Sequence, residues 1–216
     1  QDPWGYCTRA AEVLKYKTLA HLCLTHSKGN FRRIADIGCG LGWLAKDLAA
    51  KGARVTAIDL SPAAVLRADR SLPPDALEPV FAAGSVTAIP LANNSIDLMV
   101  IADGLFTWGF DEATCEEILR QAAATLVPGG KILLMDYLKV GDQASFMRIA
   151  RSNELRVTRI LPLHDRPWYA VELLLRPLRH QLWCQRVLSN LNLARMLSLV
   201  GRVLGRCGSA HICVMA

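Results

Sequence analysis

The residues with the clearest chemical potential form the glycine-rich turn Asp36-Ile37-Gly38-Cys39-Gly40-Leu41-Gly42, which follows a short apolar segment. Glycines let a backbone turn tightly and approach a bound nucleotide closely. The spacing is G-x-G-x-G, and Trp43 stands where the dinucleotide-binding pattern G-x-G-x-x-G requires its last glycine. The carboxylate of Asp36 is placed to reach an amino group of a ligand, directly or through water, although it could also simply cap the turn.

Two later segments carry groups that suit a nucleoside. Asp59 ends a strand-like stretch, where a carboxylate can accept hydrogen bonds from two ribose hydroxyls or stabilise the N-terminus of the next helix. Ser85 and Val86 follow another strand-like stretch, where a hydroxyl and a backbone amide could bind the edge of an adenine. We expect the neighbouring residues to line the same ligand, namely Cys39, Trp43, Leu60 and Ala102.

These segments, together with Gly84 to Pro90, Ser95-Ile96-Asp97 and Leu126-Val127-Pro128-Gly129-Gly130, resemble the ordered motif series of class I methyltransferases that use S-adenosylmethionine (SAM). The resemblance covers residues from about 34 to 137. It implies that SAM is the cofactor, that S-adenosylhomocysteine (SAH) is its product, and that the last strand of a seven-stranded sheet is antiparallel. One departure is Ser85, where many members carry Asp.

A second, shorter resemblance concerns the N-terminus. The stretch Asp2-Pro3-Trp4-Gly5-Tyr6, followed by Glu12, Lys15 and Tyr16, is similar to NodS-like N-methyltransferases. It implies an N-terminal lid in which Lys15 or Tyr16 approaches the SAM carboxylate. Trp4 and Tyr6 would then contact the acceptor, or else pack as part of a terminal arm.

The resemblance places the reacting centre after the fourth strand, at residues 101–108. Methyl transfer is an in-line displacement, so the enzyme mainly positions its two partners and needs a base only if the acceptor loses a proton. Asp103 is the candidate for orienting or deprotonating the acceptor, unless it caps a helix. His164 is a second candidate base, unless it only forms a loop hydrogen bond with Asp165. The candidate acceptor-binding aromatics are Phe106, Trp108, Tyr137, Trp168 and Tyr169, and ordinary core packing is the alternative for the first three.

The elements that must position these residues alternate between strand-like and helix-like patterns. This predicts an α/β fold with a Rossmann-like, seven-stranded, mostly parallel sheet and helices on both faces, in a single domain spanning 1–216. The expected strands are 33–37, 54–58, 80–82, 96–101, 131–137, 156–161 and 210–215. The expected helices are 10–24, 43–50, 112–126 and one that opens at Ser61-Pro62. Residues 1–30 would form the lid, and about 164–208 a helical insertion before the last strand.

Composition narrows the classes of protein that fit. The 216 residues are 52% hydrophobic and 20% charged, which is typical of a globular protein. We see no uninterrupted apolar stretch of roughly 18 residues and no signal peptide in the opening residues. The seven cysteines include no C-x-x-C pair, so we expect neither a disulfide framework nor a metal site, and a reducing cytoplasmic location.

Charge is distributed unevenly along the chain. From Ala144 onward there are eleven arginines, no lysine and three acids, while the whole chain has a net charge of +6. The Leu/Arg-rich insertion could cap the acceptor site, form a dimer surface, or lie on a membrane as an amphipathic helix. The lack of lysine argues against nucleic acid as the partner. The sequence thus predicts a methyltransferase, monomeric or homodimeric, for nitrogen or oxygen of a small or amphipathic acceptor. The alternatives are a lipid or quinone acceptor with peripheral membrane contact, and a non-catalytic SAM-binding module.

Overall fold

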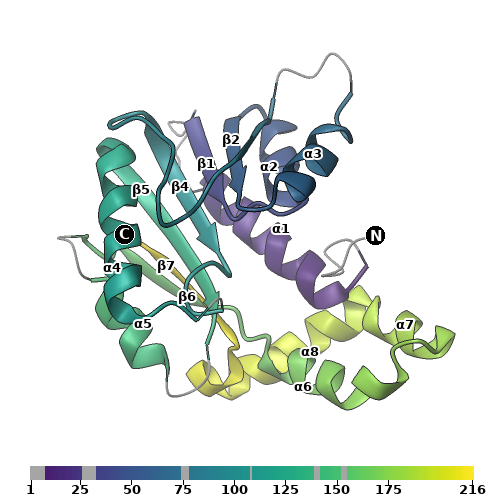
Figure 1. Cartoon of the computed structure of the whole chain (residues 1–216). Coiled ribbons are helices and arrows are strands. Elements are labelled where there is room, and N and C mark those ends of the chain that lie inside the picture. The colour runs from purple at the N-terminus through teal and green to yellow at the C-terminus, as the bar shows by residue number, and fades with distance from the viewer. Residues whose placement is uncertain (1–7, 26–32, 74–77, 108, 139–141, 152–154) are drawn as a thin grey trace.

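A single seven-stranded sheet forms the centre of the computed structural model, which describes residues 8–25, 33–73, 78–107, 109–138, 142–151 and 155–216 (Figure 1). The strand order is β3-β2-β1-β4-β5-β7-β6, and β7 runs antiparallel to both of its neighbours. The strands are β1 (Arg33–Ile37), β2 (Arg54–Asp59), β3 (Val80–Ala83), β4 (Ile96–Ala102), β5 (Leu126–Tyr137), β6 (Arg159–Pro162) and β7 (His211–Met215). The predicted Rossmann-like sheet is therefore confirmed.

Helices cover both faces of the sheet. One face buries Leu19 of α1 and Leu48 of α2 against Ile34 and Val100, and the other buries Ile118 of α4 and its neighbours against Ile101. The central strands are apolar on both sides because helices exclude water from both faces. The helices are α1 (Ala10–Thr25), α2 (Trp43–Ala49), α3 (Pro62–Asp69), α4 (Glu112–Thr125), α5 (Gln143–Ile149), α6 (Arg166–Leu175), α7 (Leu182–Leu188) and α8 (Leu191–Val203), with short 3-10 turns η2 (Arg176–Leu178) and η3 (Gly205–Gly208).

Two expected strand boundaries were wrong, and one helix was not predicted. Strand β5 already begins at Leu126, because Leu126 pairs with Ile96 and a shift in register absorbs the Pro-Gly-Gly segment before Lys131 pairs with Leu98. Strand β6 begins at Arg159, three residues later than expected. Helix α5 was not predicted, although it buries Phe146 and Ile149 in the core.

The expected helical insertion lies between β6 and β7 and consists of α6, η2, α7, α8 and η3. In Figure 1 these helices form a lobe beside the N-terminal end of α1. Trp168 of α6 and Ala194 of α8 pack on Ala10 and Ala11 of α1, so the lobe is attached to the N-terminal helix through a small apolar cluster.

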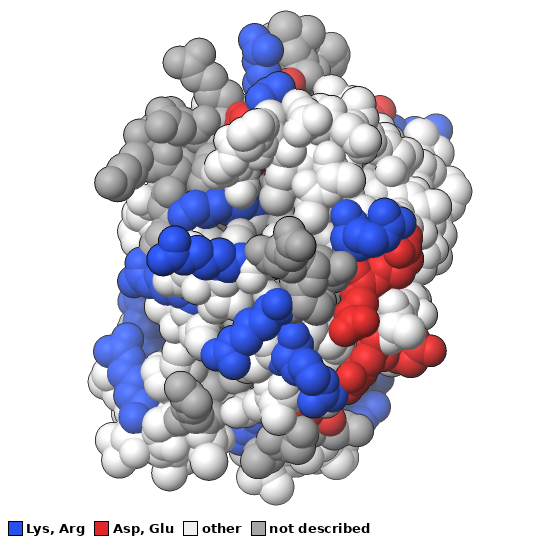
Figure 2. Space-filling view, turned by 90° about the vertical axis from the view of Figure 1, so that its left-hand side faces the viewer, with Lys and Arg blue, Asp and Glu red and all other residues white. Residues whose placement is uncertain are grey.

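Charges are unevenly distributed on one side of the molecule. In Figure 2 most of the visible acidic side chains lie in one strip, and basic side chains spread over the rest of that side. Helix α4 contributes acids that are paired on the surface, since Glu112 binds Arg148 and Glu117 lies 2.6 Å from Arg120. Within the described residues, no helix is both long and apolar enough to cross a membrane.

A close backbone contact holds α8 in place and provides a stability test. A Cβ atom at Gly201 would lie 2.2 Å from the carbonyl oxygen of His164. Alanine normally stabilises a helix interior by up to about 1 kcal/mol relative to glycine. Here we expect Gly201→Ala to lower the free energy of unfolding by about 1–3 kcal/mol, because the backbones must separate. Urea unfolding followed by circular dichroism measures this, with Ser198→Ala on the same helix as the control. A gain in stability for Gly201→Ala would contradict the packing described.

Candidate functional site

The glycine-rich turn lies at the carboxyl end of β1 and is bonded to the end of β2. The amides of Gly38 and Cys39 donate to the carbonyl of Ile58 at 2.8 and 3.0 Å, and the Gly40 amide donates to the Asp59 carboxylate at 2.7 Å. The three glycines of the turn have φ angles of +77°, +53° and +71°, which other residues rarely adopt. The turn and Asp59 therefore form one rigid unit at the edge of the sheet.

Asp36 is a buried carboxylate that lacks a full set of partners. Its side chain is 3% exposed, and Oδ2 has no hydrogen-bond partner among the described residues. Burial, and secondarily the charge of Asp59, raises the pKa of Asp36 to about 7. An unpartnered buried carboxylate is costly unless a ligand satisfies it, so a cationic amino group at this point would be stabilised.

Asp59 already accepts two backbone hydrogen bonds, one from Gly40 and one from the Ser61 amide at 2.9 Å. Each carboxylate oxygen has a second lone pair, so Asp59 can still accept from two hydroxyls. Beside it the side chain of Leu60 is 75% exposed, and Trp43 is 39% exposed. This arrangement offers hydrogen-bond acceptors for the hydroxyls of a ribose and an apolar surface for a nucleobase.

The third predicted segment for the nucleoside is less open. The Ser85 hydroxyl lies 2.8 Å from the Thr87 hydroxyl and also accepts from the Thr87 amide. Val86 packs against the core, and Ala102 lies partly buried at the end of β4. Tyr16 lies partly buried on α1, and the Lys15 ammonium is 5.3 Å from the centre of its ring.

A buried ionic network connects α1 to the carboxyl edge of the sheet. Lys15 Nζ lies 2.6 Å from Asp103 Oδ2 and 2.7 Å from Glu12 Oε2. The other Asp103 oxygen lies 3.2 Å from His211 Nε2, and His211 Nδ1 lies 2.5 Å from Asp165 Oδ2. We call Glu12, Lys15, Asp103, Asp165 and His211 the edge network; it joins α1, β7 and the segments that follow β4 and β6.

The members of the edge network shift one another's pKa. Burial opposes charge on His211, but the bonds to Asp103 and Asp165 prevail and raise its pKa to about 9. Burial likewise opposes charge on Asp103, yet Lys15 and His211 hold its pKa well below the usual range. Burial would lower the pKa of Lys15, whereas the charges of Asp103 and Glu12 raise it. A carboxylate with such a low pKa is a weak base, so Asp103 is better suited to orienting a group than to removing a proton.

The loop after β4 is organised by Asp136, a residue that the sequence analysis did not single out. Its carboxylate accepts from the amides of Leu105, Phe106 and Thr107 at 2.8–2.9 Å. Asp103 itself has a φ angle of +52°, an uncommon conformation for a residue with a side chain. The Asp136 bonds fix the loop that presents Asp103.

The candidate aromatic residues separate into two groups. Tyr137, Tyr169 and His211 pack together with ring centres 5.2–5.7 Å apart, and the Tyr169 hydroxyl donates to Glu12 at 2.8 Å. Phe106 instead packs edge-to-face on Phe146, so the structure does not place it with Tyr137 in one wall. Phe106, Trp108 and Tyr137 were candidates for one aromatic wall or for ordinary core, and Phe106 packs against α5, where the bond from its amide to Asp136 helps to hold it.

His164 and Asp165 do not form the loop pair that was one expectation for them. The His164 amide donates to the Ser209 hydroxyl at 2.8 Å, whereas Asp165 binds His211. His211 lies 46 positions beyond Asp165, and only the antiparallel return of β7 brings the two together. A lone histidine at the start of an apolar strand offered no spacing signal that could have identified it. The predicted site residues Trp4, Tyr6 and Trp108 lie outside the described residues.

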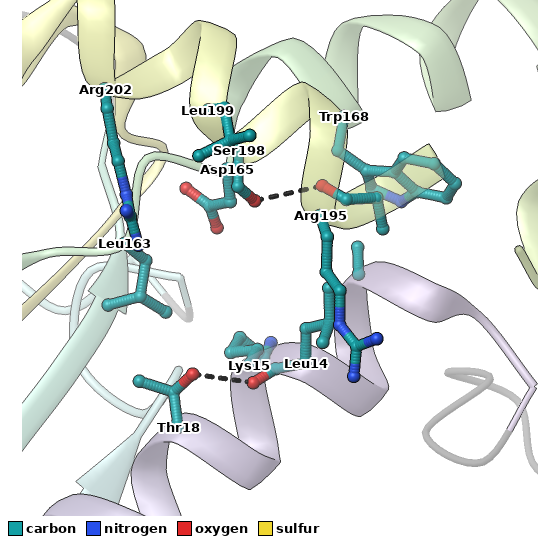
Figure 3. A pocket seen from close by; sticks show the side chains of 12 residues that line it. Leu14, Lys15, Thr18, Leu163, Asp165, Trp168, Arg195, Ser198, Leu199 and Arg202 are labelled. Atoms are coloured by element: carbon teal, nitrogen blue, oxygen red, sulfur yellow. Dashed lines mark hydrogen bonds between the residues drawn. The ribbon is translucent and has the colours of Figure 1, made fainter. Parts of the chain in front are cut away.

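A cavity of about 300 Å³ lies between α1, α8 and the start of α6. Figure 3 shows Leu14 and Thr18 of α1 on one side, Arg195 and Arg202 of α8 on the other, and Trp168 beyond them. Trp168 is 1% exposed, and its indole N–H donates to Glu172. Lys15 and Asp165 also line this cavity, so it borders the edge network.

Comparison with known proteins points to one family. Residues 34–130 match a family model described as a methyltransferase domain. A ubiquinone biosynthesis O-methyltransferase from Alkalilimnicola ehrlichii is 35% identical over 144 residues, which cover 61% of this chain and 52% of the relative. A demethylmenaquinone methyltransferase from Renibacterium salmoninarum is 31% identical over 106 residues, which cover 49% and 41%. The chain spans about half the length of the curated relatives it matches.

Solved structures share the fold. The N-methyltransferase NodS from Bradyrhizobium japonicum, in complex with SAH, has a TM-score of 0.63 and 21% identity and covers 75% of this chain and 84% of that one. Magnesium protoporphyrin IX methyltransferase from Synechocystis, with bound SAM, has a TM-score of 0.59 and 17% identity, with 70% and 73% covered. At these identities the likeness establishes the fold.

The raised pKa of His211 predicts how stability depends on pH. A folded-state pKa of about 9 against an ordinary 6.5 means that the stabilisation is complete below pH 6.5 and is lost as pH rises through 9. We expect the stability difference between the wild type and His211→Gln to shrink by on the order of 3 kcal/mol across that window. Urea unfolding at several pH values gives the free energy of unfolding of both proteins. Titration of Asp36 and the thiols occurs in both proteins, so it cancels in the difference. A difference that does not change between pH 6.5 and 9 would show that the folded protein does not raise the pKa of His211.

Proposed function

We propose that this chain, which belongs to the class I SAM-dependent methyltransferases, transfers the methyl group of SAM to nitrogen or oxygen of a small or amphipathic acceptor. The observation that carries the proposal is Asp36, a buried carboxylate with an unpartnered oxygen beside the glycine-rich turn. A ligand with a cationic amino group at one end and a nucleoside at the other fits Asp36 and Asp59 together.

In this proposal the cofactor lies across the carboxyl ends of β1, β2 and β4. Asp36 binds the amino group, Asp59 binds the ribose hydroxyls, and the exposed side chain of Leu60 covers the adenine. Ser85 and Val86 would bind the edge of the base. The remaining contacts would come from Tyr16, Gly38, Cys39, Gly40, Gly42, Trp43 and Ala102. A side chain at Gly42 would be strained at its φ of +71° and would have to displace the ring of Phe81, which lies 2.4 Å from the position of a Cβ atom.

The chemistry that bound SAM supplies is a displacement, in which an acceptor lone pair bonds to the methyl carbon while the C–S bond breaks and leaves its electron pair on sulfur. The protein's contribution is position and electrostatics. Asp103, fixed by Lys15 and His211, would orient an N–H or O–H of the acceptor rather than deprotonate it. The ring faces of Tyr137 and Tyr169 next to it would favour a partly positive acceptor. A base role for His164 stays a prediction.

The acceptor would enter beneath the helical lobe. The cavity between α1 and α8 supports a capping role for the insertion, because it borders Lys15 and Asp165 of the edge network. Curated relatives include O-methyltransferases, and NodS is an N-methyltransferase, so we propose nitrogen or oxygen as the acceptor atom. A lipid or quinone acceptor at a membrane surface is the second candidate, favoured by the exposed leucines of the lobe.

We further propose a cytoplasmic location. The supporting observation is that the six described cysteines are free thiols, five of them buried. Buried thiols of this kind persist in a reducing compartment.

Calorimetry with SAH tests the cofactor site. We expect SAH to bind the wild type, and Asp36→Asn to weaken binding about 10- to 100-fold, because a charge-assisted hydrogen bond contributes about 1.5–3 kcal/mol. Asp69→Asn, an exposed acid on α3, is the matched control and should leave the affinity unchanged. If SAH does not bind the wild type, or if Asp36→Asn binds equally well, the proposed cofactor site is wrong.

Turnover separates an enzyme from a SAM-binding module. We expect methyl transfer from labelled SAM to at least one member of a panel of amines, phenols and reduced quinones, because in this proposal Asp103 would orient the acceptor. The product from the accepting class then identifies the acceptor atom. SAH binding without transfer to any class would favour the non-catalytic alternative.

A further inference from the structure

Helix α8 presents an apolar stripe to solvent. Met196, Leu199, Val200 and Val203 follow the spacing of one helix face, and their exposures are 55%, 56%, 48% and 88%. The opposite face of α8 is the buried one, where Ala194 is 1% exposed and Gly201 touches the His164 backbone. An apolar stripe that points away from the core indicates an interaction surface.

The rest of the lobe extends this apolar exposure. Leu173 and Leu174 of α6 are 68% and 77% exposed, and Leu182 and Trp183 of α7 are 74% and 51% exposed. Ten of the sixteen large hydrophobic residues that are exposed among the described residues lie between 173 and 204. The exposure is therefore a property of this lobe and not of the surface in general.

From residue 173 onward, every Asp, Glu, Lys or Arg residue is an arginine, so these formal charges are all positive. Glu172 is the last acid of the chain, and six arginines follow it, at positions 176, 179, 186, 195, 202 and 206. Arg195 and Arg202 extend from α8 over the cavity that faces α1, which Leu199 of the stripe also lines, and both are exposed. An ordinary solvated helix face mixes charges of both signs, so an unmixed positive charge next to apolar side chains calls for an anionic partner.

We propose that the outer face of α6, α7 and α8 docks on an anionic lipid bilayer. Interfacial helices bury an apolar face at the level of the acyl chains and hold anionic headgroups with flanking arginines, which is the pattern that α8 shows. Trp183 is of the residue type that favours the membrane interface. A second copy of this chain is a poorer occupant, because a two-fold interface would place arginines against arginines with no acid between them.

This docking goes beyond the proposed methyl transfer and does not depend on it. The cavity between α1 and α8 is lined by Leu199, Arg195 and Arg202, so the docked face would lie next to the mouth of this cavity. An amphipathic molecule held in the bilayer could then reach the edge network without crossing bulk water.

Co-sedimentation of the full chain with vesicles tests the proposal. We expect binding to vesicles of phosphatidylcholine with 30% phosphatidylglycerol, weakened by salt, and little binding to pure phosphatidylcholine. Val203→Glu should reduce the bound fraction strongly, because it places in the stripe a polar group with the same negative charge as the lipid headgroups. Each of Arg195→Gln and Arg202→Gln should weaken binding about fivefold, the ratio that corresponds to ~1 kcal/mol.

Matched controls keep these outcomes interpretable. Leu66→Glu changes a 50% exposed leucine on α3 to the same acid, and Arg70→Gln removes an exposed arginine there; neither should affect vesicle binding. Unchanged thermal melting of Val203→Glu confirms that its fold is intact. Equal sedimentation of Val203→Glu and wild type would overturn the proposal. The proposal would also be overturned if sedimentation velocity showed that the wild type is a dimer and that Val203→Glu is a monomer. The face would then join two copies of the chain. SAH calorimetry on the same samples shows independently whether the cofactor site is intact.

Discussion

The partly buried carboxylate of Asp103 sets a constraint that much of the structure satisfies. A charge removed from water needs opposite charges close by, and here they come from opposite ends of the chain, Lys15 on α1 and His211 on β7. Glu12 and Asp165 in turn compensate these two cations. Lys15 is shared by Glu12 and Asp103, and His211 is shared by Asp103 and Asp165, so the loss of either cation would remove a partner from two carboxylates. The network therefore ties the N-terminal helix and the last strand to the edge where the cofactor is proposed to bind.

The proposed cofactor side of the same edge is preorganised by backbone geometry. The glycine-rich turn is bonded to Ile58 and Asp59, so β1 and β2 present their terminal carboxylates as one unit. Asp36 and Asp59 nevertheless differ, since Asp59 has backbone donors on both oxygens while Asp36 Oδ2 has none among the described residues. That difference makes Asp36 the more ligand-dependent of the two carboxylates.

The insertion between β6 and β7 has two different faces. Its inner face packs Trp168 and Ala194 on α1, close to the edge network, and its outer face exposes leucine, valine and arginine. A helix that covered only an acceptor pocket would have no need of an apolar outer stripe. The two faces together suit a lobe that caps a site on one side and contacts an anionic, apolar environment on the other.

Local sequence determined the fold class and suggested the proposed cofactor edge, because the glycine-rich turn, the acids near the ends of β1 and β2 and the alternating apolar segments are short-range patterns with a direct structural meaning. Ser61 as the cap of α3 was equally local. Only the tertiary structure decided the acceptor side. The partners of Asp103 and Asp165 are Lys15 and His211, which are distant in sequence, and no spacing rule connects them. Phe106 shows the same limit, since bonds from Asp136 turn its segment toward α5 and away from Tyr137. Contacts between residues that are close in sequence can be predicted from patterns, whereas pairing of buried charges depends on how the strands return.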